Sequence, residues 1–391
     1  KTKYGAGFSK EMKIYFYTIL LILIYNSKAM AQTEEKKWEL NGYVKEIQAT
    51  SFTNLDSIST NSLLHNRLNF KWYPSDNWKV GIEVRNRLFV GDQINKNPLL
   101  TGLDDNRAID LSANLIERDD ALLNVTLDRL WAQWQNTSWQ VTLGRQRVNW
   151  GVDRIWNPND IFNAYSFIDF DYEERPGSDA LRVQYFKDMD YTLDLAVKIT
   201  DDPNELIAAA LYKFNKWNYD IQVLGGVYKR DIVIGTGWAG NIEKAGFKTE
   251  ISYFRNYQNF SEDSGTFISS VSMDYAFQNS LYLYGAYFYN SSGKSKNAIG
   301  DLVETDISVK NLSPFTHNFF TQLSYEFSAI TNVAMNLLYS PTDQAVFINP
   351  ALNILMGKQF DLSIISQSLF GNTNKYELLF NTIYTRIKWN F

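Results

Sequence analysis

Residues 191–200 read Tyr-Thr-Leu-Asp-Leu-Ala-Val-Lys-Ile-Thr, and their apolar and polar side chains alternate. Successive side chains of an extended strand point to opposite faces, so one face of this stretch is apolar and the other is polar. The apolar face carries Tyr191, Leu193, Leu195, Val197 and Ile199, and the polar face carries Asp194, Lys198 and Thr200. The same period of two returns in residues 267–275 and 321–326. This alternation predicts an all-β chain.

Eighteen segments can be interpreted as strands in this way. No apolar stretch after residue 31 is long enough for a membrane-spanning helix, whereas strands of about 9–11 residues cross a bilayer. The expected strands are 38–49, 62–73, 77–91, 126–136, 138–148, 179–187, 190–200, 206–215, 218–229, 231–241, 243–254, 265–277, 280–290, 318–327, 330–341, 344–356, 358–370 and 375–391. Sixteen strands remain an alternative, because the 229–231 junction is short and two prolines, Pro341 and Pro350, interrupt the last part of the pattern.

The lengths of the connections test this count. Tight turns at 74–76, 187–189, 215–217 and 278–279 follow even-numbered strands, and the long connections 50–61, 92–125, 149–178, 255–264 and 291–317 follow odd-numbered ones. A single missed strand in mid-chain would break this order. Short turns at one end and long loops at the other are typical of transmembrane barrels. We therefore expect an antiparallel up-and-down β-barrel whose strand ends carry aromatic residues, such as Trp72 and Trp78, at the membrane interfaces.

The composition excludes several kinds of site. The chain has 391 residues, no Cys and two His, so disulfide frameworks and thiolate metal sites are excluded, and we expect neither a metal ion nor a cofactor. Six glycines between residues 225 and 246 lie within alternating strands, without the strand-loop-helix context of a phosphate site. The formal charge of −5 argues against nucleic acid as a partner.

The two ends of the chain predict where in the cell the protein is located. Residues 12–31 have a basic start, an apolar run and the small residues Ala29-Met30-Ala31, which is the order of a secretory signal peptide. We expect residues 1–11 to be upstream translation and residues 32–391 to be one barrel domain. The chain stops on an amphipathic strand that ends in Phe391, which resembles the insertion signal read by the barrel-assembly machinery of outer membranes. These features predict the outer membrane of a Gram-negative bacterium, with both termini in the periplasm.

A basic patch is expected on the inner wall. Charges on the lipid face would cost about 2–4 kcal/mol each near the membrane midplane, so the polar face of each strand must line the lumen. The pore-lining basic residues are then Arg67, Arg85, Arg87, Arg129 and Arg182. Alternatively, these arginines only reflect the polar lumen that every wide barrel needs.

The connection 149–178 is the segment expected to fold into the lumen and narrow it. The candidate residues of this constriction, counted from the end of the preceding strand, are Arg145, Arg147, Trp150, Asp153, Arg154, Trp156, Asp160, Asp169, Asp171, Glu173, Glu174 and Arg175. An acidic loop opposite a basic wall would set up a field across the pore and select ions. Alternatively, the arginines of the segment pair with its own acids and pin the loop. Arg145 and Arg147 break the alternation of the preceding strand, which indicates a bulge or emergence above the membrane.

The aromatic residues of this loop allow two interpretations. Trp150 and Trp156, with Tyr165 and Phe167, could form a stacking surface for sugar rings, or they could be the packing that holds the loop in place.

This segment carries a family resemblance. The run from Gly144 through Trp150-Gly151 to residues 156–160, followed by residues 175–177, resembles the porin-like outer-membrane barrels of Bacteroidota and, more distantly, the DUF1302-type barrel proteins. The detailed match covers about 35 residues. The resemblance implies a barrel and a porin-like role, and it implies no particular solute.

The leading functional hypothesis is a passive channel for small polar or charged solutes, with outer-membrane lipid around it and no enzymatic activity. A barrel of sixteen to eighteen strands is wide enough for an aqueous path. One alternative is a non-conducting structural, surface-binding or export-partner barrel. A less favoured one is a membrane-embedded hydrolase, which would have to use His65 or His317. The solute, the ion selectivity and the oligomeric state are left open.

Overall fold

The computed structural model describes residues 36–52, 58–91, 108–165, 177–187, 191–262, 264–294, 298–299, 308–372 and 375–391. Contacts divide the chain into two compact units, Lys1–Lys37 and Trp38–Phe391, and every described strand belongs to the second. The expected signal peptide and the residues before it lie outside the described residues. Among the residues described, no helix is long and apolar enough to cross a membrane.

The second unit is almost entirely antiparallel sheet. Its strands are β1 (Trp38–Phe52), β2 (Ile58–Ser75), β3 (Trp78–Gly91), β4 (Ser112–Glu117), β5 (Ala121–Gln135), β6 (Trp139–Gln146), β7 (Ser178–Lys187), β8 (Tyr191–Lys198), β9 (Ile207–Lys216), β10 (Tyr219–Tyr228), β11 (Asp231–Ile242), β12 (Ala245–Asn256), β13 (Thr266–Ala276), β14 (Leu281–Asn290), β15 (His317–Ser328), β16 (Thr331–Ser340), β17 (Ala345–Met356), β18 (Phe360–Asn372) and β19 (Tyr376–Asn390). Within the described residues, single-turn 3₁₀ helices lie at Pro203–Glu205 and Thr342–Gln344.

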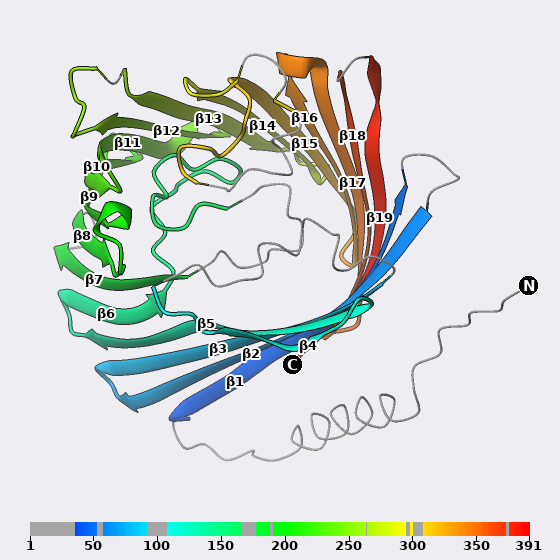
Figure 1. Cartoon of the computed structure of the whole chain (residues 1–391), viewed down its shortest axis with the longest axis horizontal. Coiled ribbons are helices and arrows are strands. Elements are labelled where there is room, and N and C mark those ends of the chain that lie inside the picture. The colour runs from blue at the N-terminus through cyan, green and yellow to red at the C-terminus, as the bar shows by residue number, and fades with distance from the viewer. Residues whose placement is uncertain are drawn as a thin grey trace, which may run out of the picture. The chain divides into compact units, whose positions relative to one another are not determined.

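Eighteen of these strands form a closed barrel (Figure 1). Each pairs with the next along the chain, β3 pairs directly with β5, and β19 returns to pair with β1. At the seam the backbone N–H of Phe391 donates to the carbonyl of Gly42, and the N–H of Gly42 donates back to Phe391. The eighteen-strand prediction is confirmed, and the sixteen-strand alternative is wrong. Closure pairs the edges that β1 and β19 would otherwise expose.

The two faces of the wall separate as the alternation predicts. Leu193, Leu195 and Val197 of β8 are each about 40% exposed on the outer face (38%, 43% and 43%), whereas Asp194 between them is 1% exposed on the inner face. The same division holds along β13, where Phe267 and Met273 are exposed. On these two strands the outer face is therefore apolar and the inner face mostly polar, which is the arrangement that a bilayer stabilises. Elsewhere the inner face is apolar, because Phe288 and Phe320 pack on Trp156 within a buried apolar cluster.

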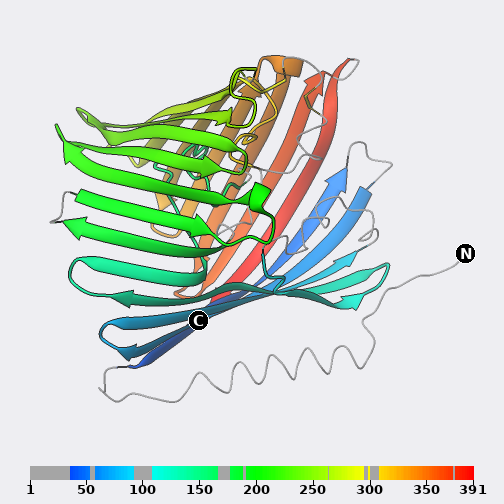
Figure 2. The same cartoon turned by 60° about the vertical axis from the view of Figure 1, so that its left-hand side comes forward.

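Short turns and long connections lie at opposite ends of the barrel (Figure 2). The turns after β2, β5, β9 and β11 have two or three residues, and exposed aromatic side chains cluster beside them. Those that are at least two-fifths exposed include Trp38, Trp72, Trp78, Trp139, Tyr191 and Trp217. The predicted order of turn lengths is confirmed for these turns. It fails at residues 229–230, a two-residue turn at the end with the long connections, and most of the connection predicted at 50–61 belongs to β1 and β2.

Strand β4 was not predicted. It is six residues long and pairs with residues 122–126 of β5, whereas β6 pairs with residues 130–135 of the same strand. Its sequence, Ser-Ala-Asn-Leu-Ile-Glu, is too short and too irregular for the period of two to identify it.

Two irregularities of the ladder have local causes. Pro350 has no N–H to donate toward β18, and the side-chain amide of the preceding Asn349 donates to the carbonyl of Ser366 instead, at 2.9 Å. In β5 the register shifts between Leu127 and Arg129, so Asp128 is an extra residue. Because of this bulge, both Asp128 and Arg129 are buried on the lumen side, although they are neighbours in sequence.

Candidate functional site: the inner loop and the basic wall

The chain leaves β6 at Gln146 and runs inside the ring of strands (Figure 1). We call residues 147–165 the inner loop. Its hydrogen bonds and ring contacts reach strands β7, β8 and β10 to β15, so it packs against one side of the lumen. The prediction of a long lumen-facing loop is confirmed.

A single carboxylate holds the middle of the inner loop. Glu250 of β12 is fully buried, and its Oε1 accepts hydrogen bonds from the backbone N–H groups of Val152 and Asp153 at 2.6 and 3.0 Å. Its Oε2 accepts from the N–H of Asn159 at 2.9 Å. Three N–H donors thus replace the water that a carboxylate loses on burial, as charge-assisted hydrogen bonds do in low-dielectric sites.

The side chain of Asn159 fits into a notch in the wall. It donates to the carbonyl of Thr236 at 3.0 Å and accepts from the hydroxyl of Ser252 at 2.8 Å. A Cβ on Gly235 would lie 2.6 Å from its Oδ1, so the glycine is required for this close approach. The Asn-Pro-Asn part of the loop is therefore seated by β11 and β12.

The two loop tryptophans are packing residues. Trp150 and Trp156 are 0% and 1% exposed. The Trp150 indole N–H donates to Asp194 at 3.0 Å, and Trp156 stacks on Phe288 with ring centroids 5.2 Å apart. Their faces are covered, so the hypothesis of a sugar-stacking surface on these rings is wrong. Tyr165 donates its hydroxyl to the carbonyl of Arg154, and Phe167 lies outside the described residues.

The described acids of the loop are buried rather than turned to the basic wall. Asp153 accepts hydrogen bonds from the hydroxyls of Ser272 and Tyr284, both at 2.8 Å. Asp160 is 1% exposed. The predicted acids Asp169, Asp171, Glu173 and Glu174, together with Arg175, lie outside the described residues. The idea of a charge field across the pore therefore stays a prediction that concerns those four acids.

Arg145 is a wall residue, not a loop residue. It lies in β6, where the pairing with β5 and β7 runs through Gly144 without a register shift. Of the two explanations given for the broken alternation, a bulge is therefore wrong, and emergence above the membrane stays a prediction. Gly144 has a φ of 115°, a conformation open to glycine, and the alternation ends there. Arg145 is buried and binds Asp179 of β7 through Nε and Nη2, at 2.8 and 2.9 Å. It also donates to the carbonyls of Leu127 and Ile109, which ties three segments together.

The other arginines of the segment differ from this one. Arg147 has left the strand and faces a pocket described below. Arg154 donates to the hydroxyl of Tyr282 at 2.8 Å and lies over the rings of Tyr282 and Tyr284. The interpretation that these arginines pair with acids of the loop is wrong for Arg145, whose carboxylate partner belongs to the wall.

The five predicted pore-lining arginines all lie on the lumen face, and most of them contact acids or amides of the wall. Asp128, the bulged residue of β5, pairs with Arg67 at 2.5 Å and with Arg85 at 3.0 Å. Arg67 also pairs with Glu83, Arg182 pairs with Asp194, Arg87 donates to Asn124, and Arg129 donates to the carbonyl of Asp128. The wall is thus a charge network with an excess of arginine rather than a bare basic surface.

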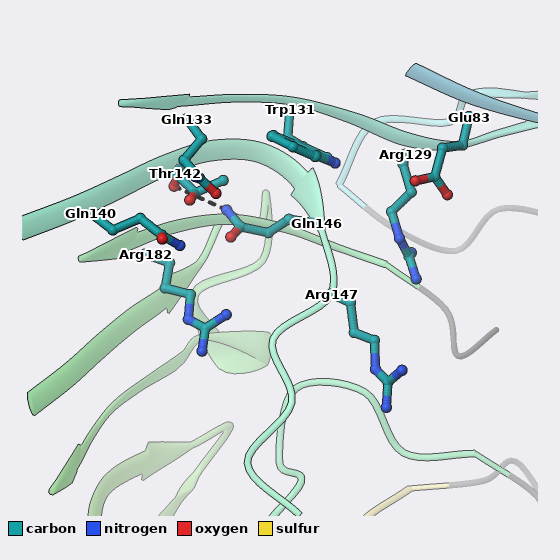
Figure 3. A pocket seen from close by; sticks show the side chains of 9 residues that line it. All are labelled: Glu83, Arg129, Trp131, Gln133, Gln140, Thr142, Gln146, Arg147 and Arg182. Carbon is teal, nitrogen blue, oxygen red and sulfur yellow. Dashed lines mark hydrogen bonds between the residues drawn. The ribbon is translucent and has the colours of Figure 1, made fainter. Parts of the chain in front are cut away.

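An open pocket lies beside this network, next to Gln146 and Arg147, where the inner loop begins (Figure 3). Its volume is about 410 Å³. The lining side chains come from β3, β5, β6, β7 and the first residue of the inner loop: Glu83, Arg129, Trp131, Gln133, Gln140, Thr142, Gln146, Arg147 and Arg182. In the described part of the chain, no group of three or more His, Asp or Glu side chains is placed to hold a metal ion.

Comparison with known proteins gives a likeness of structure without a likeness of sequence. No protein-family model and no curated protein matches the chain. A BenF-like porin from Pseudomonas fluorescens Pf-5 superposes with a TM-score of 0.60 at 11% identity, over 91% of this chain and 99% of that one. OccK5 (OpdH) of Pseudomonas aeruginosa gives a TM-score of 0.58 at 6% identity, over 91% and 99% of the two chains. OccAB3 of Acinetobacter baumannii gives 0.56 at 9% identity, over 90% and 99%. The chain has the fold of these porins.

Sequence reasoning missed Glu250, Asp128, Asn159 and Trp131. The bulge at Asp128 had a usable signal, because apolar residues occupy odd positions from Leu123 to Leu127 and even positions from Leu130 onward. The sequence carries no such signal for Glu250 or Asn159. A polar residue that faces the lumen cannot be distinguished from other lumen-facing polar residues until its partner on another segment is known.

Proposed function

We propose that this chain is an outer-membrane channel for the passive diffusion of small polar or charged solutes, with its lumen narrowed by the loop 149–178. The observation that carries this proposal is the division of the lumen. The inner loop packs on the side of β7, β8 and β10 to β15, while the pocket of about 410 Å³, lined mainly from β3, β5 and β6, stays open and carries mostly charged and amide side chains. The porin fold of the structural neighbours supports the same function.

The proposal includes the position in the membrane. The exposed apolar belt would face outer-membrane lipid of a Gram-negative bacterium, and the aromatic residues beside the short turns would mark the periplasmic interface, where the ends of the barrel at Trp38 and Phe391 also lie. We further propose that residues 12–31 are a signal peptide after an upstream segment 1–11, and that the last strand is read by the barrel-assembly machinery. Membership of the Bacteroidota porin-like barrels rests on the sequence resemblance.

We propose no enzymatic role for the two histidines. His65 lies in the lumen wall with its ring 5.4 Å from that of Tyr43. His317 shares a hydrogen bond of 2.8 Å with the hydroxyl of Tyr287, near the end of the barrel that carries the long connections. The two rings lie on β2 and β15, on separate parts of the wall, so they do not form one catalytic group.

A planar-bilayer recording tests the channel. The chain from Gln32 would be refolded and compared with a version that lacks residues 152–174, and heat-modifiable gel mobility would show that both barrels have folded. We expect steady current from the intact chain and a larger current after the deletion. Silence from the intact chain with current after the deletion would favour a plugged structural or export-partner barrel. Silence from both folded proteins would contradict the channel.

A further inference from the structure

One part of the outer face of the barrel is polar. Strands β1, β2 and β3 lie side by side next to the seam (Figure 1). On β1 the side chains of Lys45 and Ile47 are buried on the inner face, so Glu46 between them points outward. In the same way Asn66 of β2 and Asn86 of β3, which are paired with each other, point outward.

The outer face of the other strands lacks such side chains at this depth. Leaving aside the first two and last two residues of each of the eighteen barrel strands, the described outward positions carry no basic side chain. Their acidic and amide side chains are those of Glu46, Gln48, Asn66, Asn86 and Asn381. Asn381 pairs with Phe52, the last residue of β1, so it lies at the end with the long connections. We call Glu46, Gln48, Asn66 and Asn86 the polar sector.

The polar sector lies within the thickness of the membrane. Trp38 and Trp78 begin β1 and β3 at the end with the short turns, and Glu46 and Asn86 are each the ninth residue of their strand. A strand of about 9–11 residues crosses a bilayer. The two side chains therefore lie inside the lipid belt, at the same distance along their strands.

Acyl chains cannot satisfy these groups. The hydroxyl of Ser62 donates to Oε1 of Glu46 at 3.0 Å, and Nδ2 of Asn86 donates to Oδ1 of Asn66 at 3.0 Å. Among the residues described, Oε2 of Glu46 makes no hydrogen bond, and neither does Oδ1 of Asn86. Polar groups that face hydrocarbon without a partner are unfavourable. The polar sector therefore fits a surface that brings hydrogen-bonding groups to the same depth.

Two other occupants fit this surface less well. Lipopolysaccharide carries phosphate groups, which bind to basic side chains, whereas the polar sector has a carboxylate and no Lys or Arg. A ring of three or more copies joins two different surfaces of each chain, and the outer face offers one polar sector. A two-fold pair uses the same surface on both copies, so it can cover the polar sector completely.

We propose that two copies of this chain pair side by side in the membrane through the outer faces of β1, β2 and β3. The two-fold axis runs along the membrane normal and passes near Asn66, because β2 is the middle strand. This symmetry places β1 of each copy against β3 of the other. The second N–H of Asn86 then donates to Oε2 of Glu46 in the other copy, and the bond occurs twice. The inference rests on the proposed position in the outer membrane and is independent of conduction.

Cross-linking in lipid vesicles tests the surface. The chain has no cysteine, so Leu64→Cys on β2 and Leu323→Cys on β15 each give a single thiol on the outer face. Folded barrels, identified by heat-modifiable gel mobility, would be treated with a short membrane-permeable bismaleimide at a low ratio of protein to lipid. We expect a dimer band from Leu64→Cys and none from Leu323→Cys. Monomer from both variants, or equal dimer from both, would overturn the proposal.

The dissociation constant of the pair tests the role of Glu46. Protein extracted from outer membranes in mild detergent would be sedimented over a dilution series. Glu46→Leu should raise the dissociation constant at least about tenfold, because two symmetric hydrogen bonds to a carboxylate are lost. Thr321→Leu removes an outward polar side chain from β15 and should leave the constant unchanged.

Two results of this measurement would overturn the proposal. One is an unmodified protein that stays monomeric, with or without bound lipopolysaccharide, and the other is an unchanged dissociation constant in Glu46→Leu. A planar-bilayer recording on the same samples keeps the pairing apart from the channel. Dimers without ion current would contradict the channel alone, and ion current from a protein that stays monomeric would contradict the pairing alone.

Discussion

The carboxylate of Glu250 accepts a hydrogen bond of 2.9 Å from the backbone N–H of Asn159, across 91 residues of sequence. Two further loop N–H groups share the same carboxylate, so the position of the loop depends on one wall residue. The wall and the loop are therefore one structural unit in the lumen, and their coupling can be tested residue by residue.

Replacing Glu250 should release the inner loop. Glu250→Ala leaves three buried N–H groups without an acceptor, at roughly 1–3 kcal/mol each. The chain has no cysteine, so Ile155→Cys can report loop exposure through its rate of thiol labelling. We expect labelling at least about tenfold faster in the Glu250→Ala background. Glu326→Ala, at an exposed wall position, is the control, and an unchanged rate in Glu250→Ala would contradict the docking role.

Substitutions at two glycines should show whether the space above Gly235 positions the inner loop, or whether any added side chain disturbs the sheet. Gly235→Ala places a Cβ 2.6 Å from Asn159 Oδ1 and 2.9 Å from the carbonyl oxygen of Ile251, so Asn159 must leave its notch. Gly225→Ala, on the adjacent strand, meets nothing within 4 Å. The first variant should show increased loop labelling and noisier single-channel current, and the second should match the unmodified protein. Similar behaviour of both would show that the notch does not seat the loop.

The buried ion pair of Arg145 and Asp179 should contribute to barrel stability. Arg145→Met leaves Asp179 as an uncompensated buried charge and should lower the free energy of unfolding by roughly 3–5 kcal/mol. The double variant Arg145→Met with Asp179→Leu should recover part of that loss, because no lone charge remains. Urea unfolding in lipid vesicles measures both. Lys375→Met, from an exposed pair with Glu377, should change stability by under about 1 kcal/mol.

The charge balance of the wall should set ion preference. Asp128→Asn removes the carboxylate shared by Arg67 and Arg85, so the reversal potential under a salt gradient should shift toward anions. Arg85→Gln should shift it toward cations. Both shifts should shrink near 1 M salt, where the screening length falls to about 3 Å. Glu243→Gln, in the turn between β11 and β12, should have no effect, and a shift of the same size there would indicate that the wall network does not control selectivity.

The eighteen strands of the barrel were predictable because each carries its own signal, which β4 lacks. In β8 the alternation of Leu193, Asp194 and Leu195 is enough, since the lipid and the lumen impose opposite requirements on neighbouring residues. The site was not predictable to the same degree. The position of Trp150 depends on Asp194 and Gln222, and that of Asn159 depends on Thr236 and Ser252, contacts that only the closed barrel brings together.

The seating of the inner loop limits how such a pore can be re-engineered. The residues that receive the loop, Gly235, Glu250 and Ser252 among them, belong to strands that follow it by more than 50 residues. If residues 147–165 were grafted into another barrel, the wall residues that bind the loop would be absent. The grafted loop would then have no fixed position in the pore. A working transplant has to carry the matching inward-facing positions of β11 and β12 with the loop, and the outward-facing ones can stay native to the host.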